Sequence, residues 1–390
     1  MTRRLHIVAD AHIWGAQYAF TDLPGCDVHL QVLEKEAITR QSLTDADILL
    51  TRSSTRVNAQ LLAGTAVRFA ATATIGDDHY DKAWLEANNI AWANAAGSST
   101  GSVVEYMLAL LLELHARSLI VIPNSTIGII GAGRIGSQLA SICRNIGMQV
   151  MLNDPPREKA EEKAGFSSLE DVLAQADLIT LHTPLIRAGE YCTHHLLNEK
   201  RLTAFRGKGV INAARGVCLD NAALLDWLNG DPSRYAALDC WEDEPRAHRA
   251  LFKHTQMAIA TPHIAGHSLD GKAANTLFAY RALCRYLDIQ PQWNINKQLP
   301  PAPLSISIQT IIDDPWRNLH AAVNGLYALT EDNATMKSWS ELTNSELPNA
   351  FTGYRRHYPL RRAWQLAPVH FINVDAETRR LADAIGLKLV

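Results

Sequence analysis

Three side chains suited to acid/base and anion-binding chemistry lie within residues 211–267. Arg215 stands in the segment Asn-Ala-Ala-Arg-Gly, Glu244 in Asp-Cys-Trp-Glu-Asp-Glu-Pro, and His263 in Thr-Pro-His-Ile-Ala-Gly. An arginine can hold a carboxylate through two parallel hydrogen bonds, and a histidine oriented by a carboxylate can move a proton near neutral pH. These residue types together predict the oxidation of a hydroxy acid.

A glycine-rich segment ahead of these residues predicts where the hydride acceptor binds. It reads Gly-Ala-Gly-Arg-Ile-Gly, follows a short apolar run and opens a helical pattern. In a dinucleotide fold the first glycine permits a tight turn, the second lets backbone N–H groups approach a pyrophosphate, and the third lets helix and strand pack closely. A side chain at the second glycine would block the phosphate. We expect this segment to contact the cofactor through Gly131, Gly133, Arg134, Ile135 and Gly136.

An acidic residue favours NAD over NADP. Asp154 follows the next expected strand, 149–153, and stands about twenty residues after the glycines. A carboxylate at this point accepts hydrogen bonds from ribose hydroxyls and repels a 2′-phosphate. The glycine pattern alone often marks a loop without function, but here strand, helix and acidic residue are in register. The sequence therefore predicts an NAD-binding unit.

Length and charge limit the classes of partner. The 390 residues predict two or three domains at about 150 residues each. The hydrophobic content of 47% is sufficient for sizeable cores. The net charge of −3 gives no general attraction to nucleic acid or to a membrane surface, so we expect neither as a partner.

The cysteines and the apolar segments favour a cytoplasmic enzyme without a metal. The six cysteines are dispersed and form no Cys-x-x-Cys pair, so neither a zinc site nor a disulfide framework is expected. The apolar run at residues 5–8 is too short for a signal peptide. Glu105 and Glu113 interrupt the most apolar helix, which makes a membrane span unexpected.

Short apolar runs alternate with helical patterns, which predicts a parallel α/β architecture. The strands expected in a first unit are 5–8, 27–30, 48–50, 69–72 and 90–92. After a long helix over 101–115, the strands expected in the NAD unit are 127–130, 150–153, 178–182, 210–212, 236–239 and 258–260. Because ligands bind at the carboxyl ends of parallel strands, the residues that follow these strands are expected to converge on one edge.

Several of these segments together resemble the D-isomer-specific 2-hydroxyacid dehydrogenase family. The resemblance rests on residues 131–136, 182–185, 212–216, 239–245 and 261–266. Further matches extend over nearly the whole chain and resemble members of that family that act on a phosphorylated sugar acid; they lie at 52–53, 72–79, 154–157, 266–272, 299–303 and 354–364. The resemblance implies NAD-dependent oxidation of such an acid at C2.

The resemblance also implies a role for each matching residue. Arg215 would bind the substrate carboxylate and polarise the reacting carbonyl, His263 would be the acid/base on the C2 oxygen, and Glu244 would orient His263. The implied substrate contacts are Ser53 and Thr74, and the guanidinium of Arg52 suits a phosphate, with a solvated surface charge as the alternative. The implied cofactor contacts are Asp154, Thr183, Ala213, Ala214, Arg215, Asp239 and Gly266.

Three positions depart from the family pattern, all near the expected substrate side. His267 replaces the usual tyrosine and is an expected substrate contact of different reach and charge; the segments 97–100 and 10–12 also differ. These changes leave the choice of substrate open. The alternatives are an enzyme that acts on phosphoglycerate, glyoxylate or a simple 2-oxo acid, and an NAD-sensing binding protein without turnover.

The expected architecture has three domains. They are a flavodoxin-like substrate domain of residues 1–100 with 268–295, a Rossmann-type NAD domain of 101–267, and a smaller C-terminal α+β dimerisation domain of 296–390. The tail also carries an apolar helical stripe formed by Trp316, Leu319, Ala322, Val323, Leu326 and Tyr327. This stripe could pack on its own chain, but the resemblance favours a homodimer.

Overall fold

The chain forms two compact units. The computed structural model describes residues 3–161, 165–311 and 314–390. The first unit contains Met1–Thr100 and Ser268–Pro301, and the second contains Gly101–His267 and Ala302–Val390.

The first unit is built on a five-stranded parallel sheet with the order β2-β1-β3-β4-β5. This order, 2-1-3-4-5 along the chain, is that of flavodoxin-like folds. The strands are β1 (Arg3–Asp10), β2 (Cys26–Leu33), β3 (Ile48–Thr51), β4 (Phe69–Thr72) and β5 (Ala91–Ala93). Every residue of β3 and β4 is buried, because helices cover both faces of the sheet.

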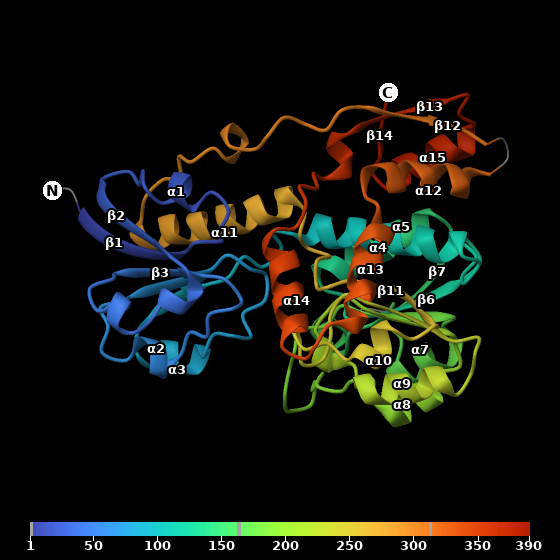
Figure 1. Cartoon of the computed structure of the whole chain (residues 1–390), viewed down its shortest axis with the longest axis horizontal. Helices are drawn as coiled ribbons and strands as arrows, with labels where there is room; N and C mark the ends of the chain where they lie inside the picture. Colours follow the sequence, from blue (N-terminus) through green and yellow to red (C-terminus); the bar gives the residue numbers. More distant parts are fainter. Residues whose placement is uncertain (1–2, 162–164, 312–313) are drawn as a thin grey trace. The chain divides into compact units, whose positions relative to one another are not determined.

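Helices of the first unit lie on the two faces of its sheet (Figure 1). One face carries α1 (Ala16–Ala19) and α11 (Leu269–Leu287), and the other carries α2 (Ala59–Leu62) and α3 (Lys82–Ala87). Short 3₁₀ turns complete the unit at Lys35–Ala37, Gln41–Leu43 and Ile295–Lys297. The return of the chain through α11 joins residues 268–301 to the amino-terminal hundred residues.

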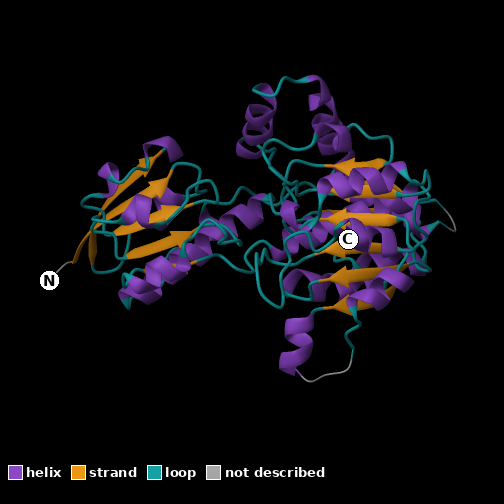
Figure 2. Cartoon of the chain, turned by 90° about the horizontal axis from the view of Figure 1, so that it is seen from below, coloured by secondary structure: helices purple, strands orange, loops and turns teal. Residues whose placement is uncertain are grey.

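The second unit contains a parallel sheet, whose strands are orange in Figure 2. It has six strands in the order β11-β10-β9-β8-β6-β7. Its strands are β6 (Thr126–Ile130), β7 (Gln149–Asn153), β8 (Leu178–Leu181), β9 (Gly209–Asn212), β10 (Tyr235–Leu238) and β11 (Met257–Ala260). All six strands lie where the sequence predicts them. Their order differs from the usual dinucleotide order 3-2-1-4-5-6, because β8 pairs directly with β6.

The place of the usual third strand is taken by an irregular segment. Beyond β7, the backbone N–H of Ser167 donates to the carbonyl oxygen of Leu152 at 2.6 Å, yet no strand is formed there. The order of the sheet still reverses between β6 and β8. This reversal places the glycine turn at a topological switch point, where ligands bind in open α/β sheets.

Helices flank this sheet on both faces. They are α4 (Thr100–Ala116), α5 (Arg134–Asn145), α6 (Pro155–Glu161), α7 (Leu169–Gln175), α8 (Glu199–Ala204), α9 (Asn221–Asn229) and α10 (Arg249–Phe252), with a 3₁₀ turn at Gly216–Cys218. Helix α4 is buried from Ser102 to Leu114, which explains its apolar character all round. In the described part of the chain, no helix combines the length and the hydropathy of a bilayer span.

The C-terminal residues add a three-stranded parallel sheet, β12-β13-β14, and four helices to the second unit. The strands are β12 (Ile306–Gln309), β13 (Pro368–Ile372) and β14 (Lys388–Leu389). The helices are α12 (Pro315–Leu326), α13 (Leu329–Ser338), α14 (Glu346–Arg356) and α15 (Ala376–Ala384), with 3₁₀ turns at Trp339–Glu341 and Trp364–Leu366.

Two expectations for the tail differ from this arrangement. Residues 302–390, expected to form most of a separate domain, share a hydrophobic core with α4, β6 and α5. The apolar stripe of α12 packs into that same core through Leu319, Ala322 and Val323. The stripe is therefore covered by its own chain, which was the alternative to a partner.

The sequence predicts a helix over residues 277–287, and helix α11 begins earlier than that, at Leu269. The side chain of Ser268 accepts a hydrogen bond from the backbone N–H of Gly271 at 3.0 Å and so caps the helix at Leu269. Gly271 lies within the first turn, where a glycine weakens the helical pattern in the sequence. The cap and the buried side of α11 outweigh that weakness.

Candidate active site

His263 and Glu244 form a hydrogen-bonded pair at the carboxyl edge of the six-stranded sheet. Glu244 lies after β10 and His263 follows β11. The Nδ1 atom of His263 is joined to Oε1 of Glu244 by a short hydrogen bond, and both side chains are about one quarter exposed. Because Glu244 engages Nδ1, Nε2 is the ring nitrogen available for proton transfer. The structure thus brings together two of the three residues expected to be catalytic.

Electrostatics keep the Glu244 carboxyl ionised. Burial raises its pKa, but the charge and hydrogen bond of His263, then the charge of Arg355 and the backbone N–H of Trp241, lower the pKa below its ordinary value. Because the pKa of Glu244 is lower in the folded than in the unfolded protein, ionised Glu244 increases the free energy of unfolding at pH values above the unfolded-state pKa. This contribution is lost as the pH falls through the lowered, folded-state pKa. Glu244 is therefore a carboxylate at neutral pH.

The turn that carries His263 is fixed by the carboxylate of Asp239. One oxygen accepts from the Thr261 hydroxyl and the Ile264 N–H, both at 2.7 Å, and the other accepts from the Ala265 N–H at 3.0 Å. Burial raises the pKa of Asp239 while the charge of His263 and these hydrogen bonds lower it, and the net direction is upward. Asp239 is an expected cofactor contact; in the protein its side chain shapes the catalytic turn.

Arg215 follows β9 in a loop that is tied to the loop of Glu244. The Asn212 side chain donates to the carbonyl oxygen of Arg215 and accepts from the Ala214 N–H, both at 3.0 Å. A Cβ atom on Gly216 would lie 1.9 Å from the carbonyl oxygen of Trp241, so the two loops touch through their backbones. This contact holds the arginine loop next to the segment that supplies Glu244.

The glycine turn fits a dinucleotide by each of its three glycines. A Cβ atom on Gly131, which has φ +94°, would lie 2.7 Å from the backbone of His182. A Cβ atom on Gly136 would lie 2.0 Å from the carbonyl oxygen of Gly131. A Cβ atom on Gly133 would meet no heavy atom within 4 Å and would project into open space. The first and third glycines therefore serve the fold, and the second keeps the approach to a pyrophosphate clear.

Asp154 connects the glycine turn to the end of β7. Its carboxylate accepts from the Ala132 N–H at 2.8 Å and from the Arg157 N–H at 3.1 Å. Each carboxylate oxygen has two lone pairs, so acceptor sites are available for ribose hydroxyls. The donor set of the turn and this carboxylate fit NAD, in agreement with the sequence prediction.

Arg157 also contacts the glycine turn, although the sequence predicts no role for this residue. Its guanidinium donates to the Ala132 carbonyl at 2.5 Å and to the Ser137 hydroxyl at 2.7 Å. It also pairs with Glu161 at 2.5 Å, which offsets its charge. Its position three residues after Asp154 is visible in the sequence, but the contact with the glycine turn depends on the fold.

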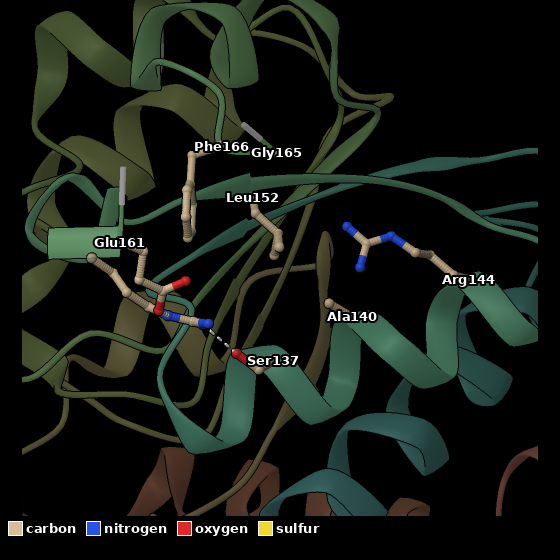
Figure 3. Close-up of a pocket in the computed structure, with 8 residues that line it drawn as sticks. Ser137, Ala140, Arg144, Leu152, Glu161, Gly165 and Phe166 are labelled. Atoms are coloured by element: carbon tan, nitrogen blue, oxygen red, sulfur yellow. Dashed lines mark hydrogen bonds and ion pairs between the residues drawn. The ribbon is translucent and has the colours of Figure 1, made fainter. Parts of the chain in front are cut away.

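A surface cavity of about 340 Å³ lies beside α5 (Figure 3). Its lining consists of Ser137, Ala140, Arg144, Leu152, Arg157, Glu161, Gly165 and Phe166. None of these residues is among the three expected to be catalytic. The cavity therefore lies beside α5, the helix that follows the glycine turn, and is not lined by the residues expected to be catalytic.

The other residues expected to contact the cofactor follow the strands of the same sheet. Thr183 follows β8, where its hydroxyl lies 3.7 Å from the Cys218 sulfur. Ala213 and Ala214 follow β9, and Gly266 closes the turn after β11. Since all six strands are parallel, the structure brings these residues to one edge. Their contacts with NAD are predictions.

The expected substrate residues Arg52, Ser53 and Thr74 belong to the first unit. Arg52 and Ser53 directly follow β3, and Thr74 follows the adjacent strand β4. The Thr74 hydroxyl bonds to that of Thr72 at 2.7 Å and donates to the carbonyl oxygen of Gly76 at 3.1 Å. The parallel sheet places the three residues at one edge of this unit. Their contact with substrate is a prediction.

His267 lies at the end of the catalytic turn in the second unit. Its backbone N–H donates to the Ile264 carbonyl at 2.8 Å, and its ring stands edge-on to the ring of Tyr358 with centroids 5.9 Å apart. Edge-to-face contacts of this kind favour one orientation of the ring. The residue that departs from the family pattern thus lies in the turn that carries His263, four residues after it, and its contact with substrate is a prediction.

Comparison with known proteins places these features in one family. Residues 113–265 match the family described as D-isomer specific 2-hydroxyacid dehydrogenase, NAD binding domain. The erythronate-4-phosphate dehydrogenase of Pseudomonas aeruginosa (strain UCBPP-PA14) is 37% identical over 389 residues, which cover 99% of this chain and 100% of the relative. The chain belongs to the D-isomer specific 2-hydroxyacid dehydrogenase family and is an NAD-dependent oxidoreductase.

Within that family, further relatives carry the same particular name. The erythronate-4-phosphate dehydrogenase of Proteus mirabilis (strain HI4320) is 37% identical over 383 residues, 98% of each chain. Among solved structures, D-lactate dehydrogenase from Aquifex aeolicus, complexed with NAD and lactic acid, has a TM-score of 0.60 at 23% identity and covers 72% of this chain and 95% of its own. The NAD-dependent formate dehydrogenase of Staphylococcus aureus, in complex with NAD, has a TM-score of 0.58 at 22% identity and covers 75% and 98%.

The glycine turn generates a paired prediction. We expect Gly133→Ala to fold with near-normal stability but to weaken NADH binding by roughly tenfold or more, because its methyl group would occupy the approach to the pyrophosphate. Gly136→Ala should instead lower the free energy of unfolding by about 1–3 kcal/mol, since its methyl group would overlap the backbone of Gly131. Fluorescence titration with NADH and urea unfolding measure the two effects. Equal NADH affinity in Gly133→Ala and the wild type would contradict the assignment of the turn.

Proposed function

We propose that the protein oxidises 4-phospho-D-erythronate at C2 to 3-hydroxy-2-oxo-4-phosphobutanoate with NAD. The observation that carries the proposal is the hydrogen-bonded pair of Glu244 and His263. The loop that carries Glu244 is in backbone contact with the loop that carries Arg215. The choice of substrate is supported by similarity along 99% of the chain to relatives named erythronate-4-phosphate dehydrogenase. The reaction would serve the biosynthesis of pyridoxine 5′-phosphate.

In the proposed mechanism His263 takes the proton of the C2 hydroxyl on Nε2. Glu244 stabilises the imidazolium that forms, because its carboxylate is joined to Nδ1. Arg215 binds the substrate carboxylate through its guanidinium and polarises the oxygen on C2. When bound, NAD supplies the acceptor for the hydride that leaves C2. A base of this kind contributes on the order of 10²–10⁴ in rate.

A related reaction of the same family is the second candidate. His267 stands where a tyrosine is usual, at a position that the resemblance assigns to the substrate, and this change could suit phosphoglycerate, glyoxylate or a simple 2-oxo acid. An NAD-sensing protein without turnover is less well supported, since the catalytic pair is assembled and hydrogen-bonded. A panel of hydroxy acids and oxo acids as substrates distinguishes both alternatives from the proposed reaction.

The substrate panel follows NADH formation with 4-phospho-D-erythronate, 3-phosphoglycerate, glycerate and lactate, and NADH consumption with glyoxylate. We expect kcat/KM for 4-phospho-D-erythronate to exceed that for each other acid by roughly tenfold or more, because a site that hydrogen-bonds a group rejects compounds that lack it. A preference for another acid would support the second candidate and overturn the proposed substrate. Turnover of no acid would support the binding protein.

Substitution of the catalytic pair tests the mechanism. His263→Ala removes the base, and Glu244→Gln removes the charge that stabilises the imidazolium, so each should lower kcat by on the order of 10²-fold or more. NADH affinity should stay within about twofold of wild type, and urea unfolding serves as the control for folding. Turnover by His263→Ala near the wild-type rate would remove His263 from the mechanism.

We also propose that the protein is a cytoplasmic homodimer. Its six cysteines are all free thiols, which suits a reducing compartment. The C-terminal residues expose the apolar side chains of Leu304, Ile311 and Ile372, and the three-stranded sheet has open edges at β12 and β14. Pairing of two copies through this region would cover both features.

Light scattering at micromolar concentration tests the dimer. We expect a mass of two chains for the wild type, and a smaller mass for Leu304→Lys with Ile372→Lys, since charged side chains would oppose burial of these positions. Tyr18→Lys, which alters an exposed aromatic residue of the first unit, is the matched control and should keep the dimer mass. A single-chain mass for the wild type would refute the homodimer.

A further inference from the structure

Three C-terminal residues contact the catalytic turn from within the same chain. Arg355 donates through Nε to the carbonyl oxygen of His263 at 3.1 Å, and Arg361 donates through Nη2 to that of Ala265 at 3.3 Å. The ring of Tyr358 stands against His267. We call Arg355, Tyr358 and Arg361 the clamp. It contacts the turn at both ends and in the middle.

Buried polar groups anchor the clamp in the second unit. The carboxylate of Asp332 accepts from the hydroxyls of Tyr354 at 2.5 Å and Tyr358 at 2.7 Å. Arg361 pairs with Glu105 of α4 at 3.4 Å, and only 6% of its side chain is exposed. Since α13 supplies Asp332 and α4 supplies Glu105, the clamp is tied to two helices of the core. It therefore has a fixed base from which to hold the catalytic turn.

The backbone of His263 needs such support. Its φ of 55° lies in the left-handed region, which residues other than glycine rarely adopt. The N–H of His263 donates to the carbonyl oxygen of Asp239 at 2.7 Å, and its own carbonyl accepts from Arg355. Both main-chain polar groups of His263 are therefore held by other residues. Arg355 supplies one of these two restraints.

Arg355 also brings a positive charge to the catalytic pair. It stands in the last turn of α14 and is partly buried. Its charge contributes to lowering the pKa of Glu244, after the larger effects of burial, which raises that pKa, and of His263, which lowers it. Two further titratable groups, whose pKa values are raised most by burial, interact with the pair: the charge of His263 lowers the pKa of Asp239, and the charge of Glu244 raises the pKa of Cys240, which the charge of Arg215 lowers.

We propose that Arg355 is a positioning residue that holds His263 in its left-handed conformation and sets the charge around the Glu244–His263 pair. The C-terminal region would then belong to the catalytic machinery of its own chain, in addition to any role in assembly. The inference rests on the proposed role of His263 as the base, but it does not depend on which hydroxy acid is the substrate. It gives a function to the clamp, which lies outside the glycine turn and outside the segments that carry Arg215, Glu244 and His263.

The test compares Arg355→Met, which removes the hydrogen bond and the charge, with Arg355→Lys, which keeps the charge. Arg356→Gln is the matched control, because Arg356 is the exposed neighbour in the same helical turn. For the acid that the wild type oxidises best, Arg355→Met should lower kcat on the order of 10- to 100-fold, since misplacing a base by about 1 Å has this effect. KM values for the acid and for NAD should stay within about twofold.

The pH profile separates positioning from a general loss of structure. In Arg355→Met the acid-side midpoint of kcat/KM should rise by about half a unit or more, because loss of a nearby positive charge makes protonation of the catalytic pair easier. Arg355→Lys should keep the wild-type midpoint with a lowered kcat, and Arg356→Gln should match the wild type in both. If Arg355→Met does not fold, as judged by circular dichroism, the comparison of Arg355→Lys with Arg356→Gln decides.

A second readout needs no substrate. The rate at which diethyl pyrocarbonate modifies His263, measured by mass spectrometry at one pH, should differ between Arg355→Met and Arg356→Gln, because Arg355 holds the backbone of His263. Equal modification rates and equal kcat in these two variants would overturn the proposal. An increased KM for the acid at unchanged kcat would also overturn it and would make Arg355 a substrate ligand. Because the modification works without turnover, a failure of the proposed function is seen separately, in the substrate panel.

Discussion

The site depends on the buried carboxylate of Asp239. With 1% of its surface exposed, this group gains its hydrogen bonds from the protein and receives three of them from the turn that carries His263. An isolated carboxylate in such a place is unfavourable by several kcal/mol, so turn and carboxylate stabilise each other. Within this turn His263 has a φ of 55°, and its imidazole is hydrogen-bonded to Glu244.

The second constraint is the parallel sheet, which brings the three residues proposed to be catalytic to one edge. Strands β9, β10 and β11 are neighbours, and the loops that follow them carry Arg215, Glu244 and His263. Backbone contact at Gly216 leaves no room between the first two loops, and Asp239 joins the second to the third. The residues proposed to be catalytic are thus positioned by contacts between the loops that follow adjacent strands, which suits chemistry that requires accurate placement.

Much of this arrangement could be predicted from the sequence, because strong local signals mark it. The eleven expected strands all form, since short apolar runs bounded by turn residues are typical of buried β-strands. The pairing of β8 with β6 could not be predicted, because sheet order depends on how connections cross in space. The early start of α11 was concealed by Gly271, and the shared core of residues 302–390 depends on contacts between segments about two hundred residues apart. The same limit applies to Arg355, whose contact with His263 links positions 92 residues apart.

The most direct measurement follows the hydrogen on C2. With 4-phospho-D-erythronate deuterated at C2, NADH formed by the wild type should carry one deuterium, detected by mass spectrometry, and His263→Ala should form labelled NADH at a rate lower by on the order of 10²-fold or more. Unlabelled NADH, or labelled NADH formed equally fast without His263, would contradict the account of hydride transfer from C2 with His263 as the base.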